Sequence, residues 1–158
     1  MVGKRTSAGL LVFRRRESGP EFFLVHPGGP FFRSKDDGWW TVPKGLIEPD
    51  EAPLTAAQRE WGEETGFALP PGPFRALGEI TQKGGKRVLA WLAEGAFDAA
   101  SLKSNLFEME WPPRSGRQQS FAEVDRGAWF DPVAAEQKVN AAQVALLHRA
   151  LELIEEPG

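Results

Sequence analysis

The sequence predicts an α/β fold, an α/β/α sandwich in which a β-sheet lies between helices. Apolar runs with strand character occupy residues 7–15 and 21–26, and amphipathic helices are expected at residues 52–65 and 140–154. With 158 residues and 41% hydrophobic content, the chain is long enough for one sizeable core and too short for two ordinary ones. We therefore expect a single domain over residues 1–158.

Further strands are expected around these elements. Segments 74–82 and 86–94 have strand character and flank Gly84 and Gly85, which are a strong signal for a tight turn. Shorter strands are expected near Trp40, Leu106 and Ala128.

Each expected helix has one apolar face. In the first helix, Leu54, Ala57 and Trp61 form the apolar stripe. The final helix carries Val144, Leu147, Leu151 and Ile154 in helical register. We expect the two helices to pack on opposite faces of the sheet.

The ends of the first helix are marked in the sequence. Pro53 is tolerated in the first turn of a helix, and Asp50 or Glu51 is expected to cap that turn. Gly66 suits the left-handed conformation that commonly follows a helix.

The first helix also carries a cluster of carboxylates. Glu60, Glu63 and Glu64 are spaced so that they fall on one side of the helix, away from its apolar stripe. Like charges at this spacing repel unless something neutralises them, and hard oxygen ligands are what Mg²⁺ and Mn²⁺ prefer. The cluster predicts a divalent-cation site. The alternative is an ordinary solvated helix face.

The segment from Gly45 to Phe67 resembles the signature of the Nudix family, and is called the box below. That signature reads Gly, five residues, Glu, seven residues, Arg-Glu, an apolar residue, any residue, Glu-Glu, any residue, Gly and an apolar residue; this chain fills every position. Trp61 is unusual, because the family commonly has an aliphatic residue there; we expect a roomier core beneath it. The resemblance implies the Nudix fold, with a mixed β-sheet held between helices, and hydrolysis of a nucleoside diphosphate linked to another group.

The resemblance also implies roles for residues of the box. It identifies Glu60, Glu63 and Glu64 as ligands of Mg²⁺, with Mn²⁺ as a possible substitute, and adds the backbone carbonyl of Lys44. Structural support of the site is expected from Gly45, Glu51, Arg59 and Gly66, with Glu51 and Arg59 forming an ion pair.

A catalytic base is needed to deprotonate the attacking water. In the Nudix family the base is a box glutamate, here Glu60, or a glutamate from a later loop. Glu123 is the preferred later residue, because it lies six residues before Trp129, an interval that resembles the diadenosine polyphosphate hydrolases of the family. Glu108 and Glu110 are the alternatives. The expected catalytic residues are therefore Glu60, Glu64 and Glu123.

The residues before the box bear on the substrate. Trp40-Thr-Val-Pro-Lys-Gly45 resembles the diadenosine tetraphosphate and diphosphoinositol polyphosphate branches of the family. Trp39 or Trp40 could stack on an adenine, although either could equally belong to the core. His26 could contact a phosphate or simply end its strand. Lys83, Lys86, Arg114 and Arg117 are candidate phosphate contacts, with ordinary turns and loops as the alternative.

Composition limits cofactors and partners. The chain has no cysteine and only two histidines, which leaves hard-cation chemistry for any metal site. A net charge of -3 gives no general attraction for long nucleic acid. The absence of a long apolar run and of a signal-peptide pattern predicts a cytoplasmic protein without a membrane segment. The oligomeric state is left open.

Three hypotheses follow for function. The first is a Mg²⁺-dependent hydrolase of dinucleoside polyphosphates such as diadenosine tetraphosphate. The second is a hydrolase of the same class acting on diphosphoinositol polyphosphates, nucleotide sugars or damaged nucleoside triphosphates. The third is a catalytically silent nucleotide-sensing module, which the intact box glutamates and the lack of an appended DNA-binding segment disfavour.

Overall fold

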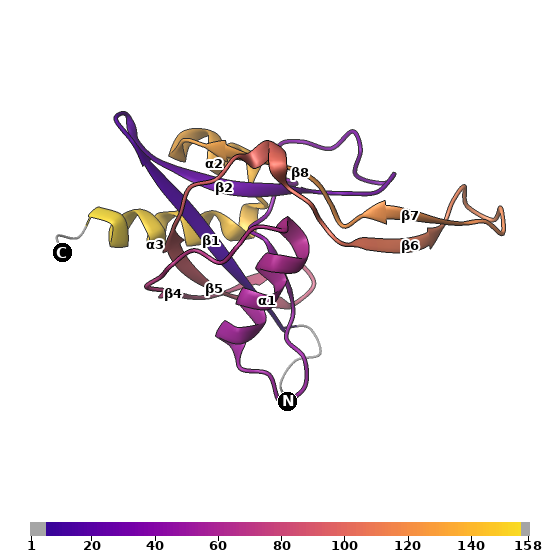
Figure 1. Ribbon diagram of the computed structural model, residues 1–158, viewed down its shortest axis with the longest axis horizontal. Coiled ribbons are helices and arrows are strands. Elements are labelled where there is room, and N and C mark those ends of the chain that lie inside the picture. Colours follow the sequence, from indigo (N-terminus) through magenta and orange to yellow (C-terminus); the bar gives the residue numbers. More distant parts are fainter. Residues whose placement is uncertain (1–5, 156–158) are drawn as a thin grey trace.

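Six strands form the central sheet of the protein. The computed structural model describes residues 6–155, and its sheet has the order β4-β5-β1-β2-β8, with β3 also paired to β1 (Figure 1). β1 and β5 run parallel, whereas the other pairs are antiparallel, so the sheet is mixed as predicted. The strands are β1 (Thr6–Arg16), β2 (Gly19–Pro27), β3 (Lys44–Leu46), β4 (Arg75–Gln82), β5 (Lys86–Glu94) and β8 (Val124–Phe130).

β1 lies in the middle of the sheet because it is apolar on both faces. Ala8, Leu10 and Val12 point into one hydrophobic cluster, while Leu11 and Phe13 point into the other. Successive side chains of a strand alternate between faces, so an unbroken apolar run requires cover on both sides. The continuous apolar pattern therefore places β1 at the centre of a sandwich.

Helices cover both faces of the sheet. α1 (Pro53–Thr65) buries Ala56, Ala57 and Trp61 in the cluster on one face, and α3 (Val144–Glu155) buries its apolar residues in the cluster on the other. α2 (Pro132–Lys138) lies on the same side as α3. The predicted α/β/α sandwich and the opposite placement of the two long helices are confirmed. Among the described helices, none combines the length and apolar character needed to cross a membrane.

The tryptophan of the box fills an aromatic cluster beneath α1. Trp61 is fully buried and its ring contacts Phe23, Phe67 and Phe97, with centroids 5.6–6.2 Å apart. Its indole N–H donates to the carbonyl of Ala68 at 3.1 Å, which satisfies its only polar group. The indole is therefore accommodated by a wide aromatic core, as the sequence predicts.

The short strand expected near Trp40 does not form. Thr41 bonds with Val25 of β2, but Trp40 instead donates its N–H to the carbonyl of Lys138, at the end of α2. Since neighbouring residues turn to different partners, no continuous ladder develops. The segment before the box is thus an irregular connection that is hydrogen-bonded to both β2 and the end of α2.

The start of α1 also differs from expectation. Ala52 is the N-terminal cap residue and makes no side-chain capping bond, so the expected cap by Asp50 or Glu51 is wrong. The carboxylate of Glu51 is instead engaged by Arg59 and by the N–H of Glu48. The other end is as predicted, because Gly66 has a φ of 73° and donates its N–H to the carbonyl of Gly62.

A separate hairpin projects from the body of the molecule (Figure 1). It consists of β6 (Leu106–Glu110) and β7 (Gln118–Ala122), which pair only with each other. The strand near Leu106 is confirmed, but β7 and α2 were not predicted, since β7 is short and mostly polar and α2 has only seven residues. Two short 3₁₀ helices complete the described structure, η1 (Ala99–Ser101) and η2 (Ala141–Gln143).

Candidate functional site

The candidate site is centred where α1 meets β3. Gly45 of β3 lies against the side chain of Glu60, so closely that a Cβ atom at Gly45 would overlap the carboxyl group of Glu60. Glu60 itself is almost fully buried. The glycine of the box is therefore required by packing, because it makes the space in which the carboxylate lies.

A second, half-buried carboxylate lies beside the first. Oε1 of Glu64 accepts a hydrogen bond from the backbone N–H of Lys44 at 3.2 Å. Burial raises the pKa of Glu64 to about 8, and the neighbouring charge of Glu60 adds to the effect. Burial also raises the pKa of Glu60. Because the two carboxyl groups are close together and poorly solvated, ionising both of them costs free energy unless a cation is nearby.

Lys44 supplies part of that positive charge. Burial lowers the pKa of its ammonium group, and the positive charge of Lys86 lowers it further, whereas the carboxylates of Glu64 and Glu60 oppose the shift. The end of the β4–β5 hairpin that carries Lys86 therefore lies near the site.

Arg59 connects the loop before α1 to the carboxylate cluster. Its guanidinium donates to both oxygens of Glu51, from Nε at 2.8 Å and from Nη2 at 2.9 Å, in the bidentate arrangement expected of this pair. Nη1 donates to Glu60 at 2.8 Å and to Glu63 at 3.2 Å. This pairing lowers the pKa of Glu51 to about 2 and raises that of Arg59.

Glu123 joins the cluster from the other end of the chain. Its backbone is fixed on two sides, because its N–H donates to the carbonyl of Asn105 and its carbonyl accepts from the N–H of Gly28. Burial and the charge of Glu63 raise the pKa of Glu123, and the charge of Glu123 in turn raises the pKa of Glu60. The Asn105 amide can also donate to the backbone carbonyl of Glu63 and to the carboxylate of Glu123.

The two alternatives to Glu123 lie elsewhere. Glu108 and Glu110 are exposed on β6, and Glu110 accepts a hydrogen bond from the N–H of Gly116 in the turn of the same hairpin. Their carboxylates therefore belong to the projecting hairpin, whereas Glu123 lies at its root beside the box. Of the three candidates, geometry favours Glu123.

The donor set fits a hard divalent cation. Glutamate oxygens are suitable ligands for Mg²⁺ or Mn²⁺, and the crowding of Glu60 and Glu64 would be relieved by one. Within residues 6–155, however, no three acidic or histidine side chains already converge in a ligand arrangement. Arg59 holds Oε2 of Glu60 and Oε2 of Glu63 in hydrogen bonds, so part of the carboxylate cluster is engaged by a guanidinium group.

The two tryptophans before the box have different positions. Trp40 is 5% exposed, packs in the core and donates its indole N–H to Asp36 at 2.8 Å, so the core alternative describes it and base stacking by Trp40 does not fit. Trp39 is 44% exposed, and its ring contacts Phe32 and the ammonium group of Lys35. Trp39 is thus the one of the pair that a base could reach.

His26 is a structural residue near the end of β2. It is fully buried, with Nδ1 3.0 Å from the carboxylate of Asp125 and Nε2 2.6 Å from the carbonyl of Lys35. It therefore fastens the loop that follows β2 to β8, and a phosphate contact by His26 does not fit.

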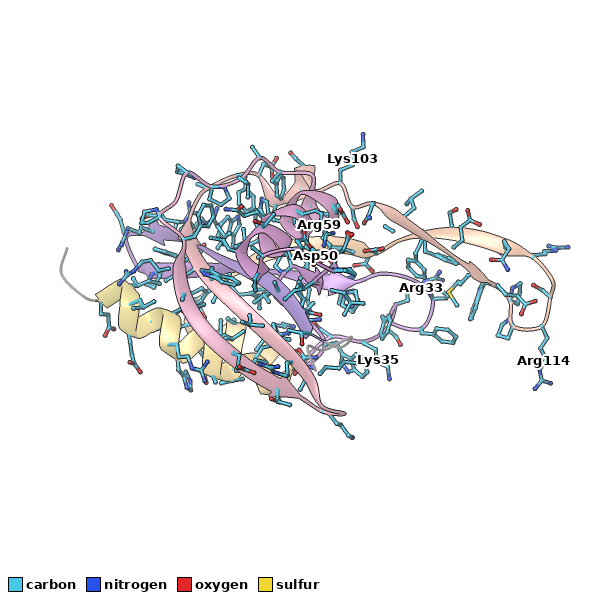
Figure 2. All side chains as sticks on the ribbon, turned by 90° about the horizontal axis from the view of Figure 1, so that it is seen from below. Arg33, Lys35, Asp50, Arg59, Lys103 and Arg114 are labelled. Carbon is cyan, nitrogen blue, oxygen red and sulfur yellow. The ribbon has the colours of Figure 1, made fainter. Side chains whose placement is uncertain are left out.

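The four basic candidates divide into two groups. Lys83 and Lys86 are exposed at the end of the β4–β5 hairpin, and the charge of Lys86 lowers the pKa of Lys44. Arg114 and Arg117 are exposed at the end of the β6–β7 hairpin, and Figure 2 shows Arg114 far from Arg59 of the box. The structure does not bring the last two to the carboxylate cluster, because the hairpin carries them outward.

One supporting residue was missed in the sequence. A Cβ atom at Gly9 of β1 would lie 2.7 Å from Cβ of Lys44, so Gly9 allows β3 to approach β1 directly beneath the box. An isolated glycine within a strand is a signal of such a close backbone approach, and it was available in the apolar run of β1.

Comparison with known proteins identifies the family of the chain. The family model for the NUDIX domain matches residues 3–150. The chain belongs to the Nudix family.

Two kinds of curated relative resemble this Nudix chain. The asymmetrical bis(5'-nucleosyl)-tetraphosphatase of Sus scrofa is 32% identical over 99 residues, which cover 56% of this chain and 63% of the relative. An 8-oxo-(d)GTP phosphatase of Mycolicibacterium smegmatis is 35% identical over 77 residues, 47% of this chain and 23% of the relative. The matched region is thus less than two thirds of either relative.

Solved structures share the fold. A Caenorhabditis elegans Ap4A hydrolase, described as a binary complex, has a TM-score of 0.67 and 21% identity, covering 94% of this chain and 97% of that one. The Nudix domain of Shewanella oneidensis NrtR, complexed with ADP ribose, also has a TM-score of 0.67, with 16% identity and coverage of 98% and 90%. At these identities the likeness establishes the fold.

The contact between Gly45 and Glu60 can be tested through stability. We expect Gly45→Ala to lower the free energy of unfolding by about 1–3 kcal/mol, because the new methyl group overlaps the Glu60 carboxyl group. Gly62→Ala on α1 is the matched control. It meets no atom within 4 Å, and should raise stability by about 0.5–1 kcal/mol. Denaturant unfolding measures both; equal effects would contradict the proposed packing.

The raised pKa of Glu64 predicts a pH dependence for the metal-free protein. Its ordinary pKa of 4.5 rises to about 8 on folding, so between these values the folded state keeps a proton that the unfolded chain has released. Stability should therefore fall as the pH rises through this window. Glu64→Gln should remove part of the fall, whereas Glu152→Gln on the exposed face of α3 should not. Denaturant unfolding with a chelator, from about pH 5 to about pH 8, would show it; identical slopes in all three proteins would exclude the assignment.

Proposed function

We propose that this Nudix protein is a divalent-metal-dependent hydrolase of a phosphoanhydride bond, with a dinucleoside polyphosphate such as diadenosine tetraphosphate as its substrate. The observation that carries the proposal is the gathering of box carboxylates against Gly45, with Glu123 brought to them from a distant part of the chain. Such a cluster is a poor structural element on its own, because its charges repel one another. It suits a cation that binds phosphate.

The box residues would hold the metal. Glu60, Glu63 and Glu64, with the backbone carbonyl of Lys44, are the proposed ligands of Mg²⁺, for which Mn²⁺ could substitute. When bound, the metal supplies positive charge to the phosphate oxygens and makes a water more acidic. Arg59 would keep its bidentate pair with Glu51 and thereby hold the box loop on the helix.

Glu123 is the proposed base. A water held in line with a phosphoanhydride must lose a proton as it attacks, and a carboxylate of raised pKa accepts that proton more readily than an exposed one. Burial raises the pKa of Glu123, and its backbone is fixed by Asn105 and Gly28. Glu60 is the alternative base within the box.

The substrate assignment rests on similarity and on the surroundings of the box. The relatives that hydrolyse bis(5'-nucleosyl) tetraphosphates support a dinucleoside polyphosphate. Trp39 offers a partly exposed ring for one base, and Lys86, whose charge acts on Lys44, offers positive charge at the hairpin end that also carries Lys83. The relative named as an 8-oxo-(d)GTP phosphatase makes damaged nucleoside triphosphates the second candidate class.

A substrate panel tests the proposal. Incubation with Mg²⁺ and diadenosine polyphosphates, nucleoside triphosphates including 8-oxo-dGTP, nucleotide sugars and diphosphoinositol polyphosphates should give the highest kcat/KM for a diadenosine polyphosphate. A chelator should abolish turnover. Glu64→Gln should reduce kcat by on the order of 100-fold or more, since it removes a ligand charge with little change in volume. No hydrolysis anywhere in the panel would support a nucleotide-sensing module instead.

The base can be identified by a series of matched variants. Glu123→Gln should lower kcat by about 10²–10⁴-fold if Glu123 removes the proton from water. Glu108→Gln and Glu110→Gln are the controls, because both residues are exposed on the projecting hairpin. Initial rates should be compared with thermal stability in each case. A loss confined to Glu60→Gln, with Glu123→Gln fully active, would move the base into the box.

A further inference from the structure

The β6–β7 hairpin has one apolar face that the catalytic proposal does not use. Phe107 and Phe121 are directly opposite each other across the two strands. Met109 shares this face, because alternate residues of a strand point to the same side. Trp111 follows directly after β6. An isolated two-stranded hairpin is only marginally stable in water, so this face needs a partner.

Its partner is the loop that follows β2, residues 28–39. Gly29 lies against the ring of Phe107, where a Cβ atom would come within 3.0 Å of Cζ. Further out, Phe31 and Trp111 meet edge to face with centroids 5.4 Å apart. Phe31 nevertheless stays 61% exposed. Loop and hairpin therefore form one extension of the body that ends in an accessible aromatic pair.

The loop is held in place by buried and charged groups. His26 bonds to the carbonyl of Lys35, while Asp36 accepts from the indole of Trp40 at 2.8 Å and from the ammonium group of Lys138 at 2.7 Å. An aromatic side chain on a fixed loop loses less entropy on binding a ligand than one on a free loop. Phe31 is thus displayed on a prearranged support.

The extension is continuous with the candidate active site. The backbone of Glu123 bonds to Gly28 at the start of the loop and to Asn105 immediately before β6. From Asn105, Trp111 is six residues away, or about 20 Å at roughly 3.4 Å per residue. The aromatic pair therefore lies well beyond the carboxylate cluster, on an arm that begins at the proposed base.

The arm carries four basic and four acidic side chains. The acids are engaged elsewhere or face away from the aromatic pair, because Asp36 and Asp37 pair with Lys138, and Glu108 and Glu110 alternate with the apolar residues of β6. Arg33 and Lys35 lie on the loop, and Arg114 and Arg117 lie at the end of the hairpin; in Figure 2, Arg33 is seen between Arg59 and Arg114. Exposed aromatic rings together with cations suit a ligand that has both a base and phosphates, since bases stack on such rings and phosphates pair with the cations. This combination favours a nucleotide over a purely apolar partner.

We propose that Phe31 and Trp111 form a second nucleobase site, which holds the far nucleoside of a dinucleoside polyphosphate while the anhydride lies at the box. The inference rests on the proposed function and deepens it, because it explains how a two-headed nucleotide is preferred. A nucleotide with one base can occupy the box and leave this second site empty. The aromatic pair should therefore affect the affinity for two-headed ligands and leave one-headed ligands unchanged.

Equilibrium binding of non-hydrolysable analogues tests the inference. Phe31→Ala and Trp111→Ala should each weaken binding of a methylene-bridged diadenosine tetraphosphate by roughly 5- to 150-fold, the range of one base stack. Binding of the corresponding ATP analogue should change less than about twofold. Phe31→Tyr, which keeps a ring, should restore most of the affinity. Leu106→Ala is the control, since Leu106 is 64% exposed at the start of β6 and off the apolar face.

The outcomes separate this inference from the proposed function. If Phe31→Ala, Trp111→Ala and Leu106→Ala all bind the two-headed analogue like the unaltered protein, or if both analogues weaken equally, the second base site is wrong. The same holds if the unaltered protein does not bind the two-headed analogue. Hydrolysis of the substrate panel is measured independently, so the catalytic proposal can stand while the base site fails. Circular dichroism of each variant verifies folding, and exposed Phe31 keeps the test valid if Trp111→Ala unfolds the hairpin.

Discussion

The contact between Gly45 and Glu60 is the constraint on which the site depends. Because Gly45 has no side chain, α1 can lie so close to β3 that a carboxylate is buried against the strand. Gly9 makes the matching approach possible on the β1 side of β3. The aromatic cluster around Trp61 fixes the other face of the helix, so the position of Glu60 is determined from both directions. A small backbone displacement would move the carboxylate out of place.

This close packing brings negative carboxylates together, and the positive charge of Arg59 offsets part of their repulsion. Burial raises the pKa values of Glu60 and Glu64, and Glu123 adds a further negative charge. Arg59 reaches four glutamates, counting a longer approach of 3.7 Å to Glu48 in addition to Glu51, Glu60 and Glu63. Its bidentate pair with Glu51 holds the box loop on the helix, and its bonds to Glu60 and Glu63 place positive charge beside two carboxylates of the cluster. One arginine therefore links the loop before α1 to the buried acids.

The fold and the box could be predicted because they follow from local rules. Three patterns each predict their element without reference to the rest of the chain. These are the apolar run of β1, the glycine turn between β4 and β5, and the amphipathic pattern of α3. Long-range placement was less accessible. The sequence around Trp39 and Trp40 does not show which of the two rings is buried in the core, because core packing and base stacking both use tryptophan. Likewise, the positions of Glu123 and Glu110 depend on where the β6–β7 hairpin leaves and rejoins the body of the molecule, which is a long-range feature of the fold. The carboxylate cluster itself was predicted, but its engagement by Arg59 in place of a ready ligand arrangement was not.

The double anchoring of Glu123 has a consequence for how such a protein can diversify. Two residues far apart in the chain bond to the backbone of Glu123. Gly28, at the start of the loop, donates to its carbonyl, and Asn105, just before β6, accepts from its N–H. An insertion or deletion near either bond would shift the register and displace the carboxylate. Length changes farther out, at the hairpin turn around Arg114, would leave the root unaltered. Insertions and deletions are thus tolerated at the tip of the arm, whereas the number of residues at its base must stay constant to keep Glu123 in place.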